Sequence, residues 1–129
     1  MSTEKLKILV LDDEPIVCKR LQPALEKLGF EVDTFTQSLE ALHHIQDTNY
    51  DIIITDLKMK GIDGMRFLQE AKNRNPATEV IVITGFATLE TAKESFQKGV
   101  FDFIAKPFKL SEIQEVVTKV AAKIKASRS

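Results

Sequence analysis

The chain has 129 residues, with 18 basic and 19 acidic side chains that give a formal net charge of −1. This length favours one compact domain, and the balanced charge argues against direct binding of nucleic acid, which draws on an excess of positive charge. The aliphatic runs are far shorter than the roughly 20 residues that cross a membrane, and the single cysteine, Cys18, excludes an internal disulfide. We therefore expect one cytoplasmic domain.

Short aliphatic runs alternate along the chain with segments of helical periodicity. Five runs are expected to form buried strands, at residues 8–11, 32–35, 52–55, 80–84 and 101–105. Between them, apolar residues recur every three or four positions, as in the second helix behind a Ser38 cap. In the fourth helix the apolar face is expected to consist of Leu89, Ala92 and Phe96. Strict alternation of strand and helix predicts a doubly wound α/β domain with five parallel strands and five helices.

Polar side chains stand at the carboxyl ends of four predicted strands. Asp12 and Asp13 follow the first strand, Asp56 follows the third, Thr84 ends the fourth and Lys106 follows the fifth. In doubly wound sheets these ends share one edge, where ligands and reactive groups lie. Clustered carboxylates repel each other unless a cation compensates them. Oxygen ligands in a compact site favour Mg²⁺, with Mn²⁺ as the alternative ion.

Each of these residues, taken alone, has a simpler interpretation. Asp12 and Asp13 can stabilise the first helix ahead of Pro15, where negative charge is favoured by the helix dipole. Asp56 can begin a loop, and Lys106 can be a solvated surface amine. Because every one of them stands at the carboxyl end of the appropriate strand, we favour a shared functional site.

The same positions carry a resemblance to a known family. The motifs are Asp12-Asp13, Ile54-Thr55-Asp56-Leu57-Lys58-Met59, Gly61-Ile62-Asp63-Gly64-Met65, Thr84-Gly85 and Lys106-Pro107-Phe108. With them the chain resembles, over residues 5–124, the receiver domain of bacterial two-component response regulators, similar to the chemotaxis protein CheY. Residues 84–88 and 99–103 are similar to the nitrogen-regulator branch of these receivers.

The resemblance implies a fold, a reaction and a set of site residues. The fold would be flavodoxin-like with strand order 2-1-3-4-5, and the receiver domain would span residues 5–125, with 126–129 as a tail or the start of a linker. Asp56 would accept a phosphoryl group from a sensor histidine kinase or a phosphotransfer protein. Asp12, Asp13, Asp56 and the backbone carbonyl of Lys58 would hold Mg²⁺, and Lys106 would pair with Asp56. The chain would be a signalling domain and not an enzyme with a separate substrate.

The resemblance also implies a switch. Thr84 would turn toward the phosphoryl group, Phe103 would follow by packing alone, and Lys106–Pro107 would be a cis peptide. The surface of the fourth helix, fifth strand and fifth helix would then control an output domain or target protein, and could form a homodimer through the two helices. Lys58 and Phe86 flank the path of the hydrolytic water in this family, which predicts slow self-dephosphorylation.

Three other functions match parts of the pattern. A flavodoxin-like electron carrier needs a loop rich in Ser, Thr and Gly after the first strand, where this chain has Asp12-Asp13-Glu14. An aspartate phosphatase ordinarily carries an acid two residues after its nucleophile, where this chain has Lys58. A pseudo-receiver, which keeps the fold as an interaction module without phosphorylation, is the alternative function, and the intact set of acids, threonine and lysine argues against it.

Overall fold

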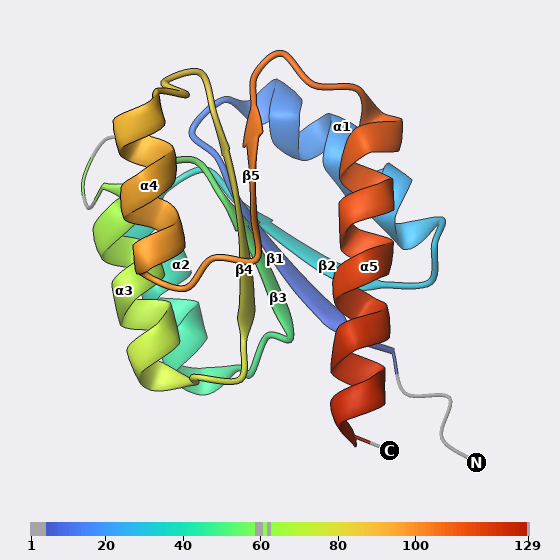
Figure 1. The fold of residues 1–129 in the computed structure, drawn as a ribbon. Coiled ribbons are helices and arrows are strands. Elements are labelled where there is room, and N and C mark those ends of the chain that lie inside the picture. The colour runs from blue at the N-terminus through green and yellow to red at the C-terminus, as the bar shows by residue number, and fades with distance from the viewer. Residues whose placement is uncertain (1–4, 59–60, 62, 129) are drawn as a thin grey trace.

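The computed structural model describes residues 5–58, 61 and 63–128. Strands and helices alternate through them (Figure 1). In chain order the elements are β1 (Lys7–Leu11), α1 (Pro15–Glu26), β2 (Glu31–Phe35), α2 (Ser38–Asp47), β3 (Ile52–Thr55), α3 (Gly64–Arg74), β4 (Glu79–Thr84), α4 (Leu89–Gln97), β5 (Asp102–Ala105) and α5 (Leu110–Arg128). The predicted alternation is therefore confirmed.

The five strands form one parallel sheet in the order β2-β1-β3-β4-β5. Helices α1 and α5 cover one face, and α2, α3 and α4 lie on the other (Figure 1). This is the doubly wound, CheY-like arrangement that the resemblance implies. The carboxyl ends of β1 and β3 lie at one level, because Leu11 pairs with Thr55 in the sheet register.

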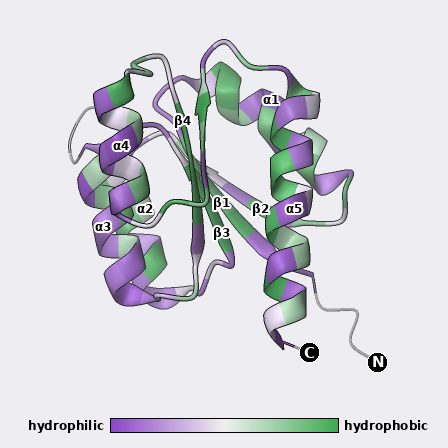
Figure 2. Cartoon of the chain, viewed as in Figure 1, coloured by the Kyte–Doolittle hydropathy of each residue, from purple (hydrophilic) through white to green (hydrophobic). Residues whose placement is uncertain are grey.

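Two apolar cores, one on each face, hold the sheet between the helices. Successive strand residues point to opposite faces, so Ile8 and Val10 of β1 enter the core beneath α1 and α5, whereas Leu9 and Leu11 enter the core beneath α2 and α3. The central strands are consequently apolar on both faces (Figure 2). Fully burying one such side chain stabilises the folded state by about 1.5–3 kcal/mol. The buried strands therefore hold the polar residues that follow them in fixed positions.

Two predictions about the helices are wrong. Ser38 does not cap α2, because the helix begins at Ser38 and Gln37 occupies the capping position without a side-chain hydrogen bond. In α4 the predicted apolar face is turned outward, with Leu89 86% exposed and Phe96 49% exposed. The spacing of apolar residues identifies a stripe but not the side that meets the sheet, and Ser95 is the one buried residue of this helix.

The carboxyl-terminal helix continues to Arg128, through positions 126–128 of the expected tail, whereas Ser129 lies outside the described residues. Its apolar stripe is buried as predicted, and it includes Ile113, Val117, Val120 and Ile124. Among the described residues, no helix combines the length and the apolar character needed to cross a membrane.

Candidate functional site

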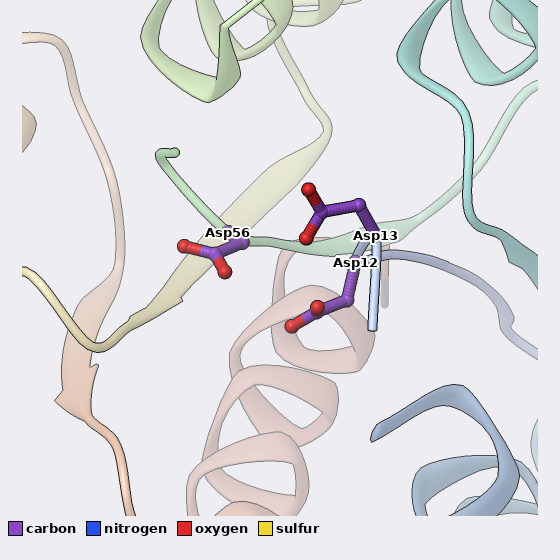
Figure 3. A group of neighbouring side chains, drawn as sticks. All are labelled: Asp12, Asp13 and Asp56. Carbon is purple, nitrogen blue, oxygen red and sulfur yellow. The ribbon is translucent and has the colours of Figure 1, made fainter. Parts of the chain in front are cut away.

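Three carboxylates meet at the carboxyl edge of the sheet. Asp12 and Asp13 follow β1 and Asp56 follows β3, and one carboxylate oxygen from each lies within 4.8 Å of the others (Figure 3). The backbone N–H of Asp56 donates to the carbonyl oxygen of Leu11 over 3.1 Å, which extends the pairing of β1 with β3 by one residue. The parallel register therefore brings residues 44 positions apart in sequence into one cluster.

Asp12 is the most buried member of the cluster. Its side chain is fully buried, and Oδ1 accepts a hydrogen bond of 2.9 Å from the backbone N–H of Glu14. Oδ2 is buried and receives no hydrogen bond from the described residues, although the Lys106 ammonium lies 2.8 Å away as an ion-pair partner. Burial raises the pKa of Asp12, and the neighbouring Lys106 offsets part of that rise.

Lys106 lies among three carboxylates. Its Nζ is 2.8 Å from Asp12 Oδ2, 2.9 Å from Asp56 Oδ2 and 3.2 Å from Glu14 Oε1. Burial alone would lower the pKa of Lys106, but the hydrogen bonds and charges of Asp12 and Asp56 outweigh it and raise the pKa above its ordinary value. Its peptide bond to Pro107 is cis. The lysine is therefore a fixed positive charge beside the Asp56 carboxylate.

The Asp56 carboxylate is held at both oxygens. Oδ1 accepts hydrogen bonds from the backbone N–H groups of Leu57 and Lys58, at 2.6 and 3.3 Å, while Oδ2 accepts from Lys106. The side chain is almost buried, at 6% exposure. Gly64, the first residue of α3, packs against the backbone of Asp56 and Leu57 so closely that a Cβ there would collide with them. The backbone of Asp56 and Leu57 is thus held between β3 and the start of α3.

Thr84 and Phe103 lie on the same face of neighbouring strands. Thr84 ends β4, is fully buried, and its Oγ1 accepts a hydrogen bond of 3.0 Å from the backbone N–H of Phe86. In the sheet register Val82 pairs with Phe103, and side chains two residues apart on a strand share a face. Phe103 is partly buried against the core beneath α2 and α3. The two side chains predicted to form the switch are therefore diagonal neighbours.

The loops that follow β3 and β4 touch across the site. The Lys58 ammonium lies over the Phe86 ring, 5.3 Å from its centroid, in a cation–π contact. Both side chains are exposed, Phe86 to 56%. The sequence places each of them two positions after a site residue, but their contact could not be read from spacing because it depends on the path of two loops.

The contact of Glu14 with Lys106 is the feature that the sequence analysis missed. The sequence shows only that Glu14 follows two aspartates, whereas its partner is 92 residues away. No pattern of spacing or periodicity signals a contact between an exposed loop residue and a lysine beyond another strand.

The donor set of the cluster suits a hard cation. The ligands on offer are carboxylate oxygens from Asp12 and Asp56, which are buried, and from Asp13, which is exposed. Mg²⁺ and Ca²⁺ prefer such oxygen donors, whereas Zn²⁺ prefers nitrogen and sulfur. The cluster can therefore hold a metal ion of this kind.

Comparison with known families identifies the family to which the chain belongs. The response regulator receiver domain family matches residues 8–118, which include all the site residues described above. The chain belongs to this family. A receiver domain is a signalling domain of two-component systems and not a classical enzyme, in agreement with the prediction from sequence.

The curated relatives of this receiver domain are longer regulators. ZraR, a transcriptional regulatory protein of Klebsiella oxytoca, is 31% identical over 129 residues, which is 100% of this chain and 29% of ZraR. The regulatory protein AtoC of Escherichia coli is 35% identical over 88% of this chain and 24% of AtoC. The DNA-binding transcriptional regulator NtrC of Escherichia coli is 31% identical over 87% of this chain and 24% of NtrC. The nitrogen-regulator resemblance is confirmed, and the chain spans less than a third of each of these proteins.

Solved structures agree with this assignment. A receiver domain protein from Clostridium thermocellum superposes with a TM-score of 0.86 at 32% identity, over 94% of this chain and 98% of that one. A CheY-like receiver domain protein from Methanospirillum hungatei superposes with a TM-score of 0.91 at 24% identity, over 96% of this chain and 99% of that one. The second likeness bears on the fold alone.

Proposed function

We propose that the receiver domain, over residues 5–125, accepts a phosphoryl group on Asp56 from a phosphohistidine of a sensor kinase or phosphotransfer protein. The observation that carries the proposal is the setting of the Asp56 carboxylate. Backbone N–H groups orient one oxygen, the Lys106 ammonium binds the other, and two further aspartates stand beside it. Phosphoryl transfer asks a protein mainly for alignment and for positive charge at the phosphoryl oxygens.

In the proposed step, an oxygen of Asp56 forms a bond to phosphorus while the phosphorus–nitrogen bond of the donor breaks. The electron pair of that bond stays on the imidazole, which leaves as neutral histidine because its other ring nitrogen carries a proton, and Asp56 becomes an aspartyl phosphate. Lys106 is already 2.9 Å from the attacking carboxylate and can follow the transferred oxygens without rearrangement of the chain. The residues of the site therefore align the acceptor and neutralise charge.

A Mg²⁺ ion, or Mn²⁺ as the alternative, would be held by Asp12, Asp13, Asp56 and the backbone carbonyl of Lys58. When bound, the ion supplies positive charge that offsets both the clustered carboxylates and the phosphoryl oxygens. The crowding of the three carboxylates supports this assignment, because the single charge of the Lys106 ammonium offsets only part of their negative charge.

We further propose that Thr84 passes the change to the surface formed by α4, β5 and α5. Its hydroxyl would turn from the Phe86 N–H toward the phosphoryl group and draw the following loop inward, and Phe103 would repack behind it. Helix α4 is free to respond, since neither apolar core contains one of its residues. This surface would contact an output domain or target protein, or a second copy through α4 and α5, in the cytoplasm.

The test is the intact mass of the chain after incubation with acetyl phosphate, with and without Mg²⁺, for the wild type and for Asp56→Asn. One added phosphoryl group that requires both Mg²⁺ and Asp56 is the expected result. A folded wild type that gains no mass, and that does not respond to beryllofluoride, would contradict the proposal and favour the pseudo-receiver, whose whole function is binding.

A further inference from the structure

Glu14 contacts the site, although the proposed reaction gives it no role. It occupies the capping position before α1, but its side chain makes no hydrogen bond to that helix. It reaches instead across the strand ends to Lys106, with Oε1 3.2 Å from Nζ and the side chain 56% exposed. The Glu14 side chain therefore contacts Lys106 of the site and not its own helix, which suggests a function at the site.

The Lys106 ammonium already has three acidic partners. It donates hydrogen bonds to Glu14 and Asp56, and the Asp12 carboxylate lies 2.8 Å from Nζ as an ion-pair partner. A phosphoryl oxygen that approaches the ammonium therefore competes with one of these three carboxylates. The Asp12 side chain is fully buried and cannot leave without a large cost, and Asp56 is the acceptor itself. Glu14 makes the longest of the three contacts, and its side chain is already 56% exposed, so it is the partner that can leave at the lowest cost.

The charge around Lys106 points in the same direction. Asp12, Glu14 and Asp56 bring three carboxylates to one ammonium, with Asp13 beside them, and phosphorylation of Asp56 raises the local negative charge by about one more. A Glu14 carboxylate that stays beside the phosphoryl group would repel it. The contact of Glu14 with Lys106 therefore stabilises the unphosphorylated domain and opposes the phosphorylated one.

We propose that Glu14 is a displaceable partner of Lys106, whose carboxylate occupies the ammonium before phosphorylation and gives way to an oxygen of the incoming phosphoryl group. Glu14 is thus a positioning residue that sets the balance between the two states, and it takes no part in the bond changes at phosphorus. This inference rests on the proposed phosphorylation of Asp56.

The experiment measures the affinity of the whole chain for beryllofluoride in the presence of Mg²⁺, by calorimetry and by fluorine NMR. Glu14→Gln keeps the size of the side chain and removes its charge, and we expect it to bind beryllofluoride roughly three- to tenfold more tightly, from the loss of one repulsive charge near the site. The rate of phosphorylation by acetyl phosphate should rise by a similar factor. Both differences should shrink in concentrated salt, because Glu14 is half exposed.

Two further variants separate the contact from charge in general. Glu26→Gln removes one charge from the far end of the same helix, away from Lys106, and should bind as the wild type does. Glu14→Asp keeps the charge but is one methylene too short for the contact, so its affinity should lie between those of the wild type and Glu14→Gln. This order of beryllofluoride affinities would support the proposal that Glu14 is a direct partner of Lys106 and is displaced.

Other outcomes would overturn the inference. Weaker binding by Glu14→Gln would mean that Glu14 places Lys106 for the reaction, and unchanged binding would mean that the contact has no effect. An equal gain in Glu14→Gln and Glu26→Gln, or a Glu14→Asp variant identical to the wild type, would reduce the effect to overall charge. A wild type that takes neither beryllofluoride nor a phosphoryl group would overturn the proposed function first, and the inference with it.

Discussion

Gly64 is expected to tolerate no side chain, because it packs against the backbone of Asp56 and Leu57. A Cβ built on Gly64 would lie 1.8 Å from the carbonyl oxygen of Asp56 and 2.6 Å from the Cα of Leu57. Comfortable contacts between such atoms need roughly 3.5 Å, so Gly64→Ala must push the start of α3 away from the acceptor loop by roughly 1.5 Å. Rotation of a side chain cannot relieve the clash, since both neighbours are backbone atoms.

The cost of this shift can be estimated for stability and for rate. Overpacking at a rigid site costs about 2 kcal/mol, which lowers the Tm of a domain of this size by roughly 8 °C. If the acceptor loop yields instead of the helix, Asp56 moves relative to Lys106, now 2.9 Å away. A misplacement of about 1 Å between reacting groups can reduce a rate about 100-fold. We therefore expect Gly64→Ala to lose both stability and phosphorylation rate.

The assay combines thermal unfolding followed by circular dichroism with the rate of phosphorylation by acetyl phosphate, measured by intact mass. Gly85→Ala is the matched control, because Gly85 also lies in a loop of the site and a Cβ there would meet no atom within 4 Å. This control should unfold and react nearly as the wild type does. A Gly64→Ala protein with the Tm and rate of the wild type would refute the packing argument.

Two further substitutions test features elsewhere in the domain. Phe86→Ala removes the ring that contacts the Lys58 ammonium. If these two side chains keep water from phosphorylated Asp56, the variant should lose its phosphoryl group several times faster after acetyl phosphate is removed. Decay within seconds in both proteins, at equal rates, would contradict slow self-dephosphorylation. Tyr50→Phe removes the hydroxyl that donates to Asp33 Oδ2 over 2.6 Å, and it should lower the free energy of unfolding by about 1 kcal/mol in urea titrations without altering phosphorylation. An unchanged urea midpoint would show that this hydrogen bond adds nothing beyond what water supplies.

The sheet and the positions of its acids follow from sequence because both depend on strong, repeated constraints. A run such as Ile52, Ile53 and Ile54 can be buried on both faces only in a sheet covered by helices on each side, and all three are at most 2% exposed. Once the strands are parallel, their carboxyl ends lie at one edge. The strand order that the resemblance implies, with β1 beside β3, then makes Asp12 and Asp56 neighbours, and the sheet has this order.

The contacts made by exposed side chains do not follow in this way. The partners of Glu14 and Lys58 are Lys106 and Phe86, and each pair joins loops from different strands. Such contacts are weak individually and leave no periodic signature, because many rotamers of a long side chain are accessible at the surface. The contact of Glu14 with Lys106 was missed for this reason: the sequence predicts contacts that depend on burial, but not contacts that depend on loop geometry.

The error in α4 has a physical meaning of its own. Periodicity predicts that an apolar stripe faces the core, yet Leu89 and Phe96 face outward and the helix contributes to neither apolar core. The cap at Thr88 holds one end of the helix and the turn before Val100 holds the other, and Ser95 is its one buried residue, so a shift of the helix would cost little buried area. Exposed apolar surface ordinarily marks a place that a partner covers. The element that sequence periodicity describes worst is thus the one that, under the proposed function, is best suited to move and to bind.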